Sequence, residues 1–309
     1  MMCTEQGSPR DAWRAQASRQ LPLGEEIFLD HVGFFVHDVE AAKRALARVG
    51  FSPTPVSVQS NPDPKSGEAR LTGTGNVTAM LSQGYIEVLF KTADTPLAAE
   101  LDAGMARYRG IHLAAFAVAD AAGWHRRLAQ LRFRVRPLVE MQRPVDTGGP
   151  KGVARFTIAR LEPGEMPEGR IQVLTHHSEP LVWQPRWLSH RNGALALTGV
   201  VIAVADVEEA AQRFARFAAR TAQSCAWGRV VALDRGCVHL VSADGLRHML
   251  PEIAIPCLPF MAACEIRVAS LAVLRELLQE TGVKSWKRED MVIAQFPPEL
   301  GQGAWIFRE

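Results

Sequence analysis

The chain has 309 residues, of which 47% are hydrophobic and 22% are charged, and its formal net charge is +2. This composition excludes a disordered chain and is typical of a globular protein with one large domain or two ordinary ones. Because the net charge is small and the arginines are scattered, we expect neither nucleic acid nor an anionic membrane as a partner.

The cysteines and the N-terminal residues indicate a cytoplasmic protein. The five cysteines are odd in number and have no C-x-x-C spacing, which favours free thiols over a disulfide framework or a zinc knuckle. The first twenty residues lack the apolar core of a signal peptide. No window approaches the roughly 18 to 20 apolar residues of a membrane span, so we expect no membrane partner.

One sequence unit organises the chain: an apolar strand with a histidine, a capping aspartate and an amphipathic helix. In the first copy, residues 29–36 read LDHVGFFV, and Asp38 follows as the N-cap of a helix that Gly50 ends. The apolar face of this helix consists of Val39, Ala42, Leu46 and Val49. Extended stretches at 52–59, 71–81 and 85–90 complete the unit.

The unit recurs three more times. The second copy runs from Gly110 past a cap at Asp120, and its last strand, GRIQVL at 169–174, matches GYIEVL at 84–89. The third copy begins near Leu197 and has a capping box at Asp206. The fourth, the weakest match, has strands at 264–268, 291–296 and 304–308 around a helix at 271–279. Such units cannot bury their apolar faces alone, so we expect them to pack on one another.

A βαβββ unit that begins LDHV, ends IEVL and is repeated in tandem resembles the vicinal oxygen chelate superfamily, specifically a glyoxalase-like protein. The similarity covers residues 27–307. In that family, paired modules curl their sheets into half-barrels around a divalent metal that holds two neighbouring substrate oxygens. The resemblance therefore implies an α+β fold of four tandem βαβββ modules, paired into two half-barrel domains of the glyoxalase/bleomycin-resistance/dioxygenase type.

The predicted domain boundaries follow from the repeats. Residues 1–26 form an appendage, and the first domain covers 27–178, with modules at 27–92 and 110–176. Residues 179–196 form a linker, whose tryptophans favour packing across the interface between the halves. The second domain covers 197–309, with modules at 197–243 and 262–309.

The resemblance, carried over position by position, implies metal ligands at His31 and Glu87, from the first and last strands of the first module. Independently of the family, one imidazole and one carboxylate on facing strands suit a borderline divalent ion such as Zn, Ni, Mn or Fe. A buried carboxylate at Glu87 is costly unless a metal, a histidine or an arginine neutralises it. A metal-free acid–base pair of His31 and Glu87 stays open.

The second module departs from this pattern. Leu113, not His112, lies seven residues before the cap at Asp120, as His31 lies seven before Asp38. Since strand side chains alternate, His112 points away from the cavity unless a bulge restores it. The last-strand position is Gln172, a neutral and weaker oxygen ligand. The predicted metal site is thus His31, Glu87, His112 and Gln172, with Glu87 also as the catalytic base.

The second half offers only one ligand at the matching positions. These positions are Gly199, His239, Ala263 and Ile306. We therefore expect this half to be structural or to supply walls of a substrate pocket. The loop 146–152, flanked by Arg143 and Lys151, is either a lid that recognises an anionic substrate or a solvated hairpin.

The leading functional hypothesis is a metal-dependent lyase or isomerase that acts on a small substrate through vicinal oxygens. The alternative is a metal-free protein of the resistance type that binds a small molecule in an apolar cavity. A third hypothesis, an extradiol dioxygenase with Fe(II), requires His112 as its second histidine. In each case the partner is a small molecule, and a homodimer is left open.

Overall fold

The computed structural model describes residues 19–63 and 65–309. Residues 1–18 of the predicted appendage, with Cys3, lie outside the described residues. None of the helices in the described part of the chain has the length and apolar character that crossing a bilayer requires.

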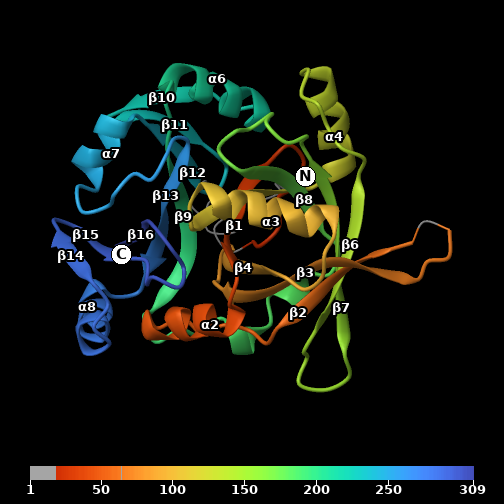
Figure 1. Ribbon diagram of the computed structural model, residues 1–309, viewed down its shortest axis with the longest axis horizontal. Coiled ribbons are helices and arrows are strands. Elements are labelled where there is room, and N and C mark those ends of the chain that lie inside the picture. Colours follow the sequence, from red (N-terminus) through yellow and green to blue (C-terminus); the bar gives the residue numbers. More distant parts are fainter. Residues whose placement is uncertain (1–18, 64) are drawn as a thin grey trace, which may run out of the picture.

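The order strand, helix and three strands occurs four times along the chain (Figure 1). The first half (residues 27–176) contains β1 (Ile27–Val36), α2 (Val39–Arg48), β2 (Ser57–Pro62), β3 (Ala69–Met80), β4 (Tyr85–Lys91), α3 (Pro96–Arg107), β5 (Gly110–Val118), α4 (Ala121–Gln130), β6 (Val139–Val145), β7 (Gly152–Arg160) and β8 (Arg170–His176). The helix α3, which links the two modules of this half, was not indicated by the sequence pattern.

The linker between the halves contains two short helical turns, α5 (Glu179–Val182) and η1 (Pro185–Trp187). The second half (residues 194–308) contains β9 (Ala194–Ala203), α6 (Val207–Ala218), β10 (Ala222–Cys225), β11 (Gly228–Ala232), β12 (Cys237–Val241), α7 (Ala243–Met249), β13 (Phe260–Val268), α8 (Leu271–Glu280), β14 (Ser285–Arg288), β15 (Met291–Gln295) and β16 (Ala304–Arg308). The short strands β10 and β14 complete the two modules for which the sequence had indicated fewer strands.

Capping side chains start the helices where the repeat predicts. Asp38 Oδ1 accepts a hydrogen bond from the Ala41 amide at 2.9 Å. Asp206 Oδ1 accepts in the same way from the Glu209 amide at 3.0 Å. Each bond satisfies one of the amides that the first helical turn leaves free. Asp120 occupies the same position before α4 but makes no side-chain capping bond.

The first half closes into an eight-stranded barrel rather than an open half-barrel. Its strands follow the order β1-β4-β3-β2-β6-β7-β8-β5, and β5 pairs with β1 to complete the ring. The closure between β2 and β6 is a single pairing, Ser60 with Gln142. In Figure 1 the long hairpins β2–β3 and β6–β7 lie on the right of the molecule. A closed ring encloses the side chains that point inward, so it defines an interior that can hold a site.

The second half keeps an open sheet of the same design. Its strands follow the order β10-β11-β12-β9-β13-β16-β15-β14, with the first strands of the two modules paired antiparallel at the centre. The sheet continues into the barrel through a pairing of Met261 on β13 with Ile111 on β5. The two halves therefore share one continuous sheet.

Alternation along β1 separates the barrel interior from the core that the two halves share. Phe35 points into the apolar part of the barrel interior with Leu89 and Leu113. Its neighbour Phe34 faces outward and meets Phe296 of the second half, with ring centroids 4.9 Å apart. From His31 to Val36 the side chains alternate, which places His31 inside the barrel, and a bulge at Asp30 interrupts this period earlier in the strand.

Gly50 fixes the end of α2 against the linker, and its replacement tests this junction. It has φ +89°, and an added Cβ would lie 2.3 Å from Leu277 Cδ2 and 2.9 Å from the Asn192 backbone nitrogen. We expect Gly50→Ala to lower the free energy of unfolding by about 1–3 kcal/mol more than Gly282→Ala does, measured by urea denaturation. Gly282 is the matched control, because it has φ +66° but an open Cβ position. Equal losses in the two variants would contradict the tight junction.

Candidate active site

The interior of the first-half barrel is polar and nearly filled. Its polar lining consists of His31, Gln59, Asn76, Tyr85, Glu87, Arg143, Arg160, Arg170 and Gln172. The cavity between these side chains measures about 20 Å³. A space of this size holds one water molecule or one ion but no organic substrate.

A buried aspartate that the sequence analysis missed orients His31. His31 Nδ1 donates to Asp30 Oδ2 at 2.7 Å, and His176 Nε2 donates to the other oxygen of Asp30 at 3.0 Å. The hydroxyl of Tyr85 also hydrogen-bonds to Asp30. Burial raises the pKa of Asp30, but the charges and hydrogen bonds of His176 and His31 outweigh burial and hold this pKa well below its usual range. Asp30 is therefore ionised at neutral pH.

A β-bulge explains how the adjacent residues Asp30 and His31 can bond to each other. In the pairing of β1 with β5, the register shifts between Leu29 and His31, and Asp30 is the extra residue. Because Nδ1 carries the proton and donates it in a hydrogen bond to Asp30, the Nε2 atom of His31 has a lone pair that faces the barrel interior. Nε2 lies 3.5 Å from Glu87 Oε2.

Glu87 is held by amides and by the charges of three arginines. Its Oε1 accepts from Asn76 Nδ2 at 2.5 Å. Burial lowers the pKa of Arg143, Arg160 and Arg170, to about 9 for Arg160, and the charge of Glu87 opposes this effect in all three. The arginine charges act on this carboxylate without forming an ion pair with it, and its one ion-pair partner among the described residues is His31.

Three of the four predicted metal ligands lie in this interior. His31, Glu87 and Gln172 all line the small cavity. Gln172 Oε1, the oxygen that would bind a metal, instead accepts from Arg160 Nε at 3.1 Å.

His112 lies outside the barrel interior. It is the extra residue at the second bulge of the β1–β5 pairing, and its side chain does not line the small cavity. Its Nε2 donates to the Tyr108 carbonyl at 2.7 Å, and its ring stacks on Tyr108 and on Phe35. Leu113 takes the inward position instead. His112 is therefore not among the side chains around the small cavity, and its role as a metal ligand in the dioxygenase hypothesis stays a prediction.

The distances in the barrel fit a metal only in part. The 3.5 Å between His31 Nε2 and Glu87 Oε2 is close to the value of about 3.4 Å for two ligands on a tetrahedral zinc. Against this, Arg160 already donates to Gln172 Oε1, and Arg143, which lines the same cavity, forms no ion pair among the described residues and adds positive charge beside it. The four-residue ligand set stays a prediction.

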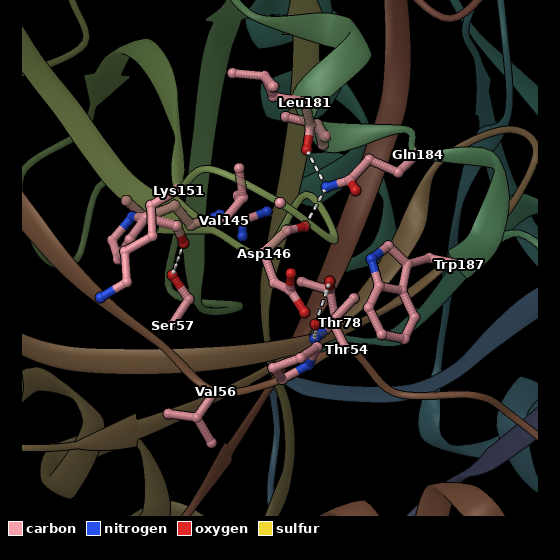
Figure 2. A pocket seen from close by; sticks show the side chains of 15 residues that line it. Thr54, Val56, Ser57, Thr78, Val145, Asp146, Lys151, Leu181, Gln184 and Trp187 are labelled. Carbon is pink, nitrogen blue, oxygen red and sulfur yellow. Dashed lines mark hydrogen bonds between the residues drawn. The ribbon is translucent and has the colours of Figure 1, made fainter.

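A larger pocket of about 360 Å³ adjoins this interior (Figure 2). It lies between the start of β2, the β6–β7 hairpin and the linker, and is lined by Thr54, Pro55, Val56, Ser57, Thr78, Arg143, Pro144, Val145, Asp146, Gly149, Lys151, Leu181, Val182, Gln184 and Trp187. Figure 2 shows Lys151 and Trp187 on opposite sides, with Asp146 between them. Arg143 lines both this pocket and the small cavity, so it joins the two.

Sequence reasoning missed Arg160 and Arg170, and it named Arg143 only as a residue beside the loop 146–152 that could recognise an anionic substrate. These arginines lie on β6, β7 and β8 and line one cavity because these strands close the barrel opposite β4. The one available signal was a charged residue within an otherwise apolar strand, which indicates an inward-facing partner when a carboxylate also needs one.

Comparisons with known proteins agree with the fold. A family model described as glyoxalase-like domain matches residues 29–218, more than half of the chain. A search of curated proteins finds no match. The family match and the structural neighbours below confirm the glyoxalase-like resemblance and the α+β fold class.

Three solved structures resemble the chain over most of its length. A hypothetical protein from Staphylococcus aureus has a TM-score of 0.60 at 10% identity, covering 91% of this chain and 99% of its own. A mutant 4-hydroxymandelate synthase from Streptomyces coelicolor has 0.52 at 14% identity, covering 92% and 93%. A xylose isomerase-like TIM barrel/4-hydroxyphenylpyruvate dioxygenase fusion protein has 0.56 at 8% identity, covering 94% and 50%. At these identities the likeness shows the fold alone.

The placement of His112 predicts a pH dependence of stability. Burial lowers its pKa from 6.5 to about 4, the charge of Arg107 adds to this effect, and the hydrogen bond to Tyr108 opposes it. Between pH 6.5 and 4, the His112 imidazole therefore binds a proton in the unfolded chain but stays neutral in the folded chain. The free energy of unfolding decreases as the pH falls through this range.

We expect wild type to lose about 3 kcal/mol more over this pH range than His112→Gln does, measured by urea denaturation at each pH. The exposed His248 provides the control variant, His248→Gln, which should follow wild type. If His112→Gln follows the wild-type pH curve, the buried neutral imidazole is contradicted.

Proposed function

Since the chain belongs to the glyoxalase-like domain family, we propose that it binds a small organic anion, with Arg143 as the contact to the anionic group. This function corresponds to the metal-free, small-molecule-binding class of the superfamily. The observation that carries it is the position of Arg143. Its side chain is buried between two cavities, and it forms no ion pair within residues 19–63 and 65–309.

The pocket beside Arg143 has the size and chemistry for such a ligand. Its volume of about 360 Å³ lies in the usual range for small-molecule sites. Arg143 and Lys151 provide positive charge, whereas Val145, Leu181 and Trp187 provide apolar surface. A ligand with a carboxylate at one end and a ring or short chain at the other matches this distribution.

The acidic residue and the serine of the pocket are already engaged within the protein, and Lys151 is exposed whereas Arg143 is buried. Asp146, the one acidic lining residue, pairs with Arg186 at 3.2 Å. The Ser57 hydroxyl donates to the Pro144 carbonyl at 2.7 Å. Arg143 is therefore the group whose charge a ligand would satisfy, since a buried guanidinium without a carboxylate partner is costly.

A metal-dependent lyase or isomerase centred on His31 and Glu87 is the second candidate. The hydrogen bond that His31 Nδ1 donates to Asp30 leaves Nε2 available as a ligand, as in metal sites where a carboxylate orients the histidine ligand. The separation of 3.5 Å from Glu87 also suits two ligands of one ion. The arginine charges around Glu87 favour the anion-binding function over this one.

Binding of phenylacetate tests the proposal, with phenylacetamide as a neutral probe of the same shape. We expect phenylacetate to change the fluorescence of the wild-type protein through Trp187, and to bind at least about 10-fold more tightly than the amide. Arg143→Met should weaken phenylacetate binding by about 10-fold or more, because a charge-assisted hydrogen bond is lost.

Arg155→Met is the matched control. Arg155 is exposed on β7 and pairs in register with Gln142, next to Arg143, but does not line the pocket. The Arg155→Met variant should bind phenylacetate with the affinity of the wild-type protein. Equal affinity for acid and amide, or unchanged binding in Arg143→Met, would rule out the proposed contact.

A further inference from the structure

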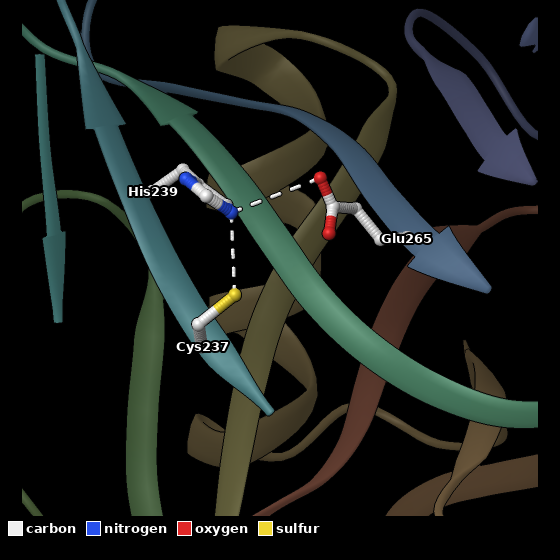
Figure 3. A group of neighbouring side chains, drawn as sticks. All are labelled: Cys237, His239 and Glu265. Carbon is white, nitrogen blue, oxygen red and sulfur yellow. Dashed lines mark hydrogen bonds and ion pairs between the residues drawn. The ribbon is translucent and has the colours of Figure 1, made fainter. Parts of the chain in front are cut away.

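Three side chains with metal-binding chemistry converge on the sheet of the second half. Cys237 and His239 project from β12 toward Glu265 on β13, with β9 passing between the two strands (Figure 3). Cys237 Sγ lies 3.2 Å from His239 Nε2, which lies 3.7 Å from Glu265 Oε1. All three ligand atoms are within 4.8 Å of one another.

Strand register and a glycine bring these residues together. Cys237 and His239 are two residues apart in one strand, so their side chains share a face. Gly199 on β9 pairs with Cys237 on one side and with Glu265 on the other. A Cβ on Gly199 would lie 2.8 Å from Glu265 Oε2 and 3.2 Å from Cys237 Sγ. Gly199 thus leaves the space in which the flanking side chains meet, at the repeat position that His31 occupies in the first half.

The distances suit the ligands of one ion. With zinc about 2.3 Å from sulfur and about 2.1 Å from nitrogen, a tetrahedral angle separates the two ligands by about 3.5 Å. The observed separation between Cys237 Sγ and His239 Nε2, 3.2 Å, is close to this value. The 3.7 Å between His239 Nε2 and Glu265 Oε1 is near the value of about 3.4 Å for a nitrogen and an oxygen ligand, and it is too long for a hydrogen bond.

Two of the three groups are poorly satisfied without an ion. Among the ion pairs of the described residues, Glu265 has His239 as its one partner, at 3.7 Å. The Nδ1 atom of His239 is buried and has no hydrogen-bond partner in the described part of the chain. The thiol of Cys237, by contrast, donates to the Thr198 carbonyl at 3.5 Å.

We propose that Cys237, His239 and Glu265 form a binding site for a borderline divalent ion such as Zn²⁺, with a fourth coordination position open. A thiolate, an imidazole and a carboxylate together favour zinc over magnesium or calcium, which prefer oxygen ligands. Three protein ligands and an open position are the arrangement of catalytic rather than structural zinc. This site would give the second half a role beyond the structural one expected from the sequence.

The protonation state of Cys237 adds a signature to the site. A cysteine that binds a metal ion is a thiolate, whereas a free cysteine thiol is mostly protonated at neutral pH. An ion that binds the thiolate must displace this proton.

Titration of the metal-free full-length protein with Zn²⁺ and Co²⁺ tests the proposal. We expect one ion per chain, a thiolate-to-cobalt charge-transfer band in the near ultraviolet, and release of about one proton per ion at neutral pH. Calorimetry in buffers of different ionisation enthalpy measures the proton release.

Substitutions locate the ion. Cys237→Ser should abolish the charge-transfer band. The isosteric Glu265→Gln should weaken binding by at least about 10- to 100-fold, because loss of a direct ligand should cost at least as much as loss of an outer-shell partner. The control Cys257→Ser removes a thiol outside the cluster and should keep the band. The double variant His31→Ala/Glu87→Gln should also bind Co²⁺ as wild type does, with circular dichroism to verify that every variant is folded.

The proposal is overturned if wild type binds neither ion, or if the band persists in Cys237→Ser. It is also overturned if the double variant in the barrel abolishes binding while Glu265→Gln leaves it unchanged. In that case the ion belongs to His31 and Glu87. Anion binding by Arg143 rests on a different pocket, so either result leaves that proposal to its own test.

Discussion

The electrostatic balance around Glu87 determines what the barrel can hold. A carboxylate buried in a nearly filled interior must be neutralised, because the cost of removing a charge from water is large. Three guanidinium groups and two side-chain amides do this from the surrounding strands. Arg170 pairs with Glu100 at 3.0 Å and Arg160 donates to Gln172, whereas Arg143 forms no ion pair among the described residues. The charge of Arg143 favours a bound anion and weighs against the divalent ion that the family resemblance implies.

Under the two proposals, the halves use one architecture for ligands of opposite charge. In the first half the ring of strands is closed, and the repeat positions hold His31 and Glu87 within an arginine-rich interior. In the second half the sheet stays open, and the same positions hold Gly199 and His239. The missing side chain at Gly199 lets neighbours on two strands approach each other. Loss of a ligand at one repeat position therefore creates room for a different ligand set beside it.

Much of the scaffold could be predicted from the sequence, because its signals are local. Capping residues such as Asp38 and Asp206 mark the helices, and strand alternation places His31 and Glu87 inward while leaving His112 out of phase. The site chemistry could not be predicted in the same way. Asp30 orients His31 because a β-bulge turns the two adjacent side chains toward each other, and no residue pattern predicts this bulge. The arginines near Glu87, and Glu265 near Cys237, come together through pairings between strands far apart in sequence.

An anomalous diffraction map, recorded at the zinc absorption edge from crystals equilibrated with Zn²⁺, tests the division of charge between the halves most directly. We predict one strong peak within bonding distance of Cys237, His239 and Glu265, and none between His31 and Glu87, where arginines surround the carboxylate. A peak between His31 and Glu87 would contradict the account, because it would show that the positive charge of the barrel does not exclude a dication.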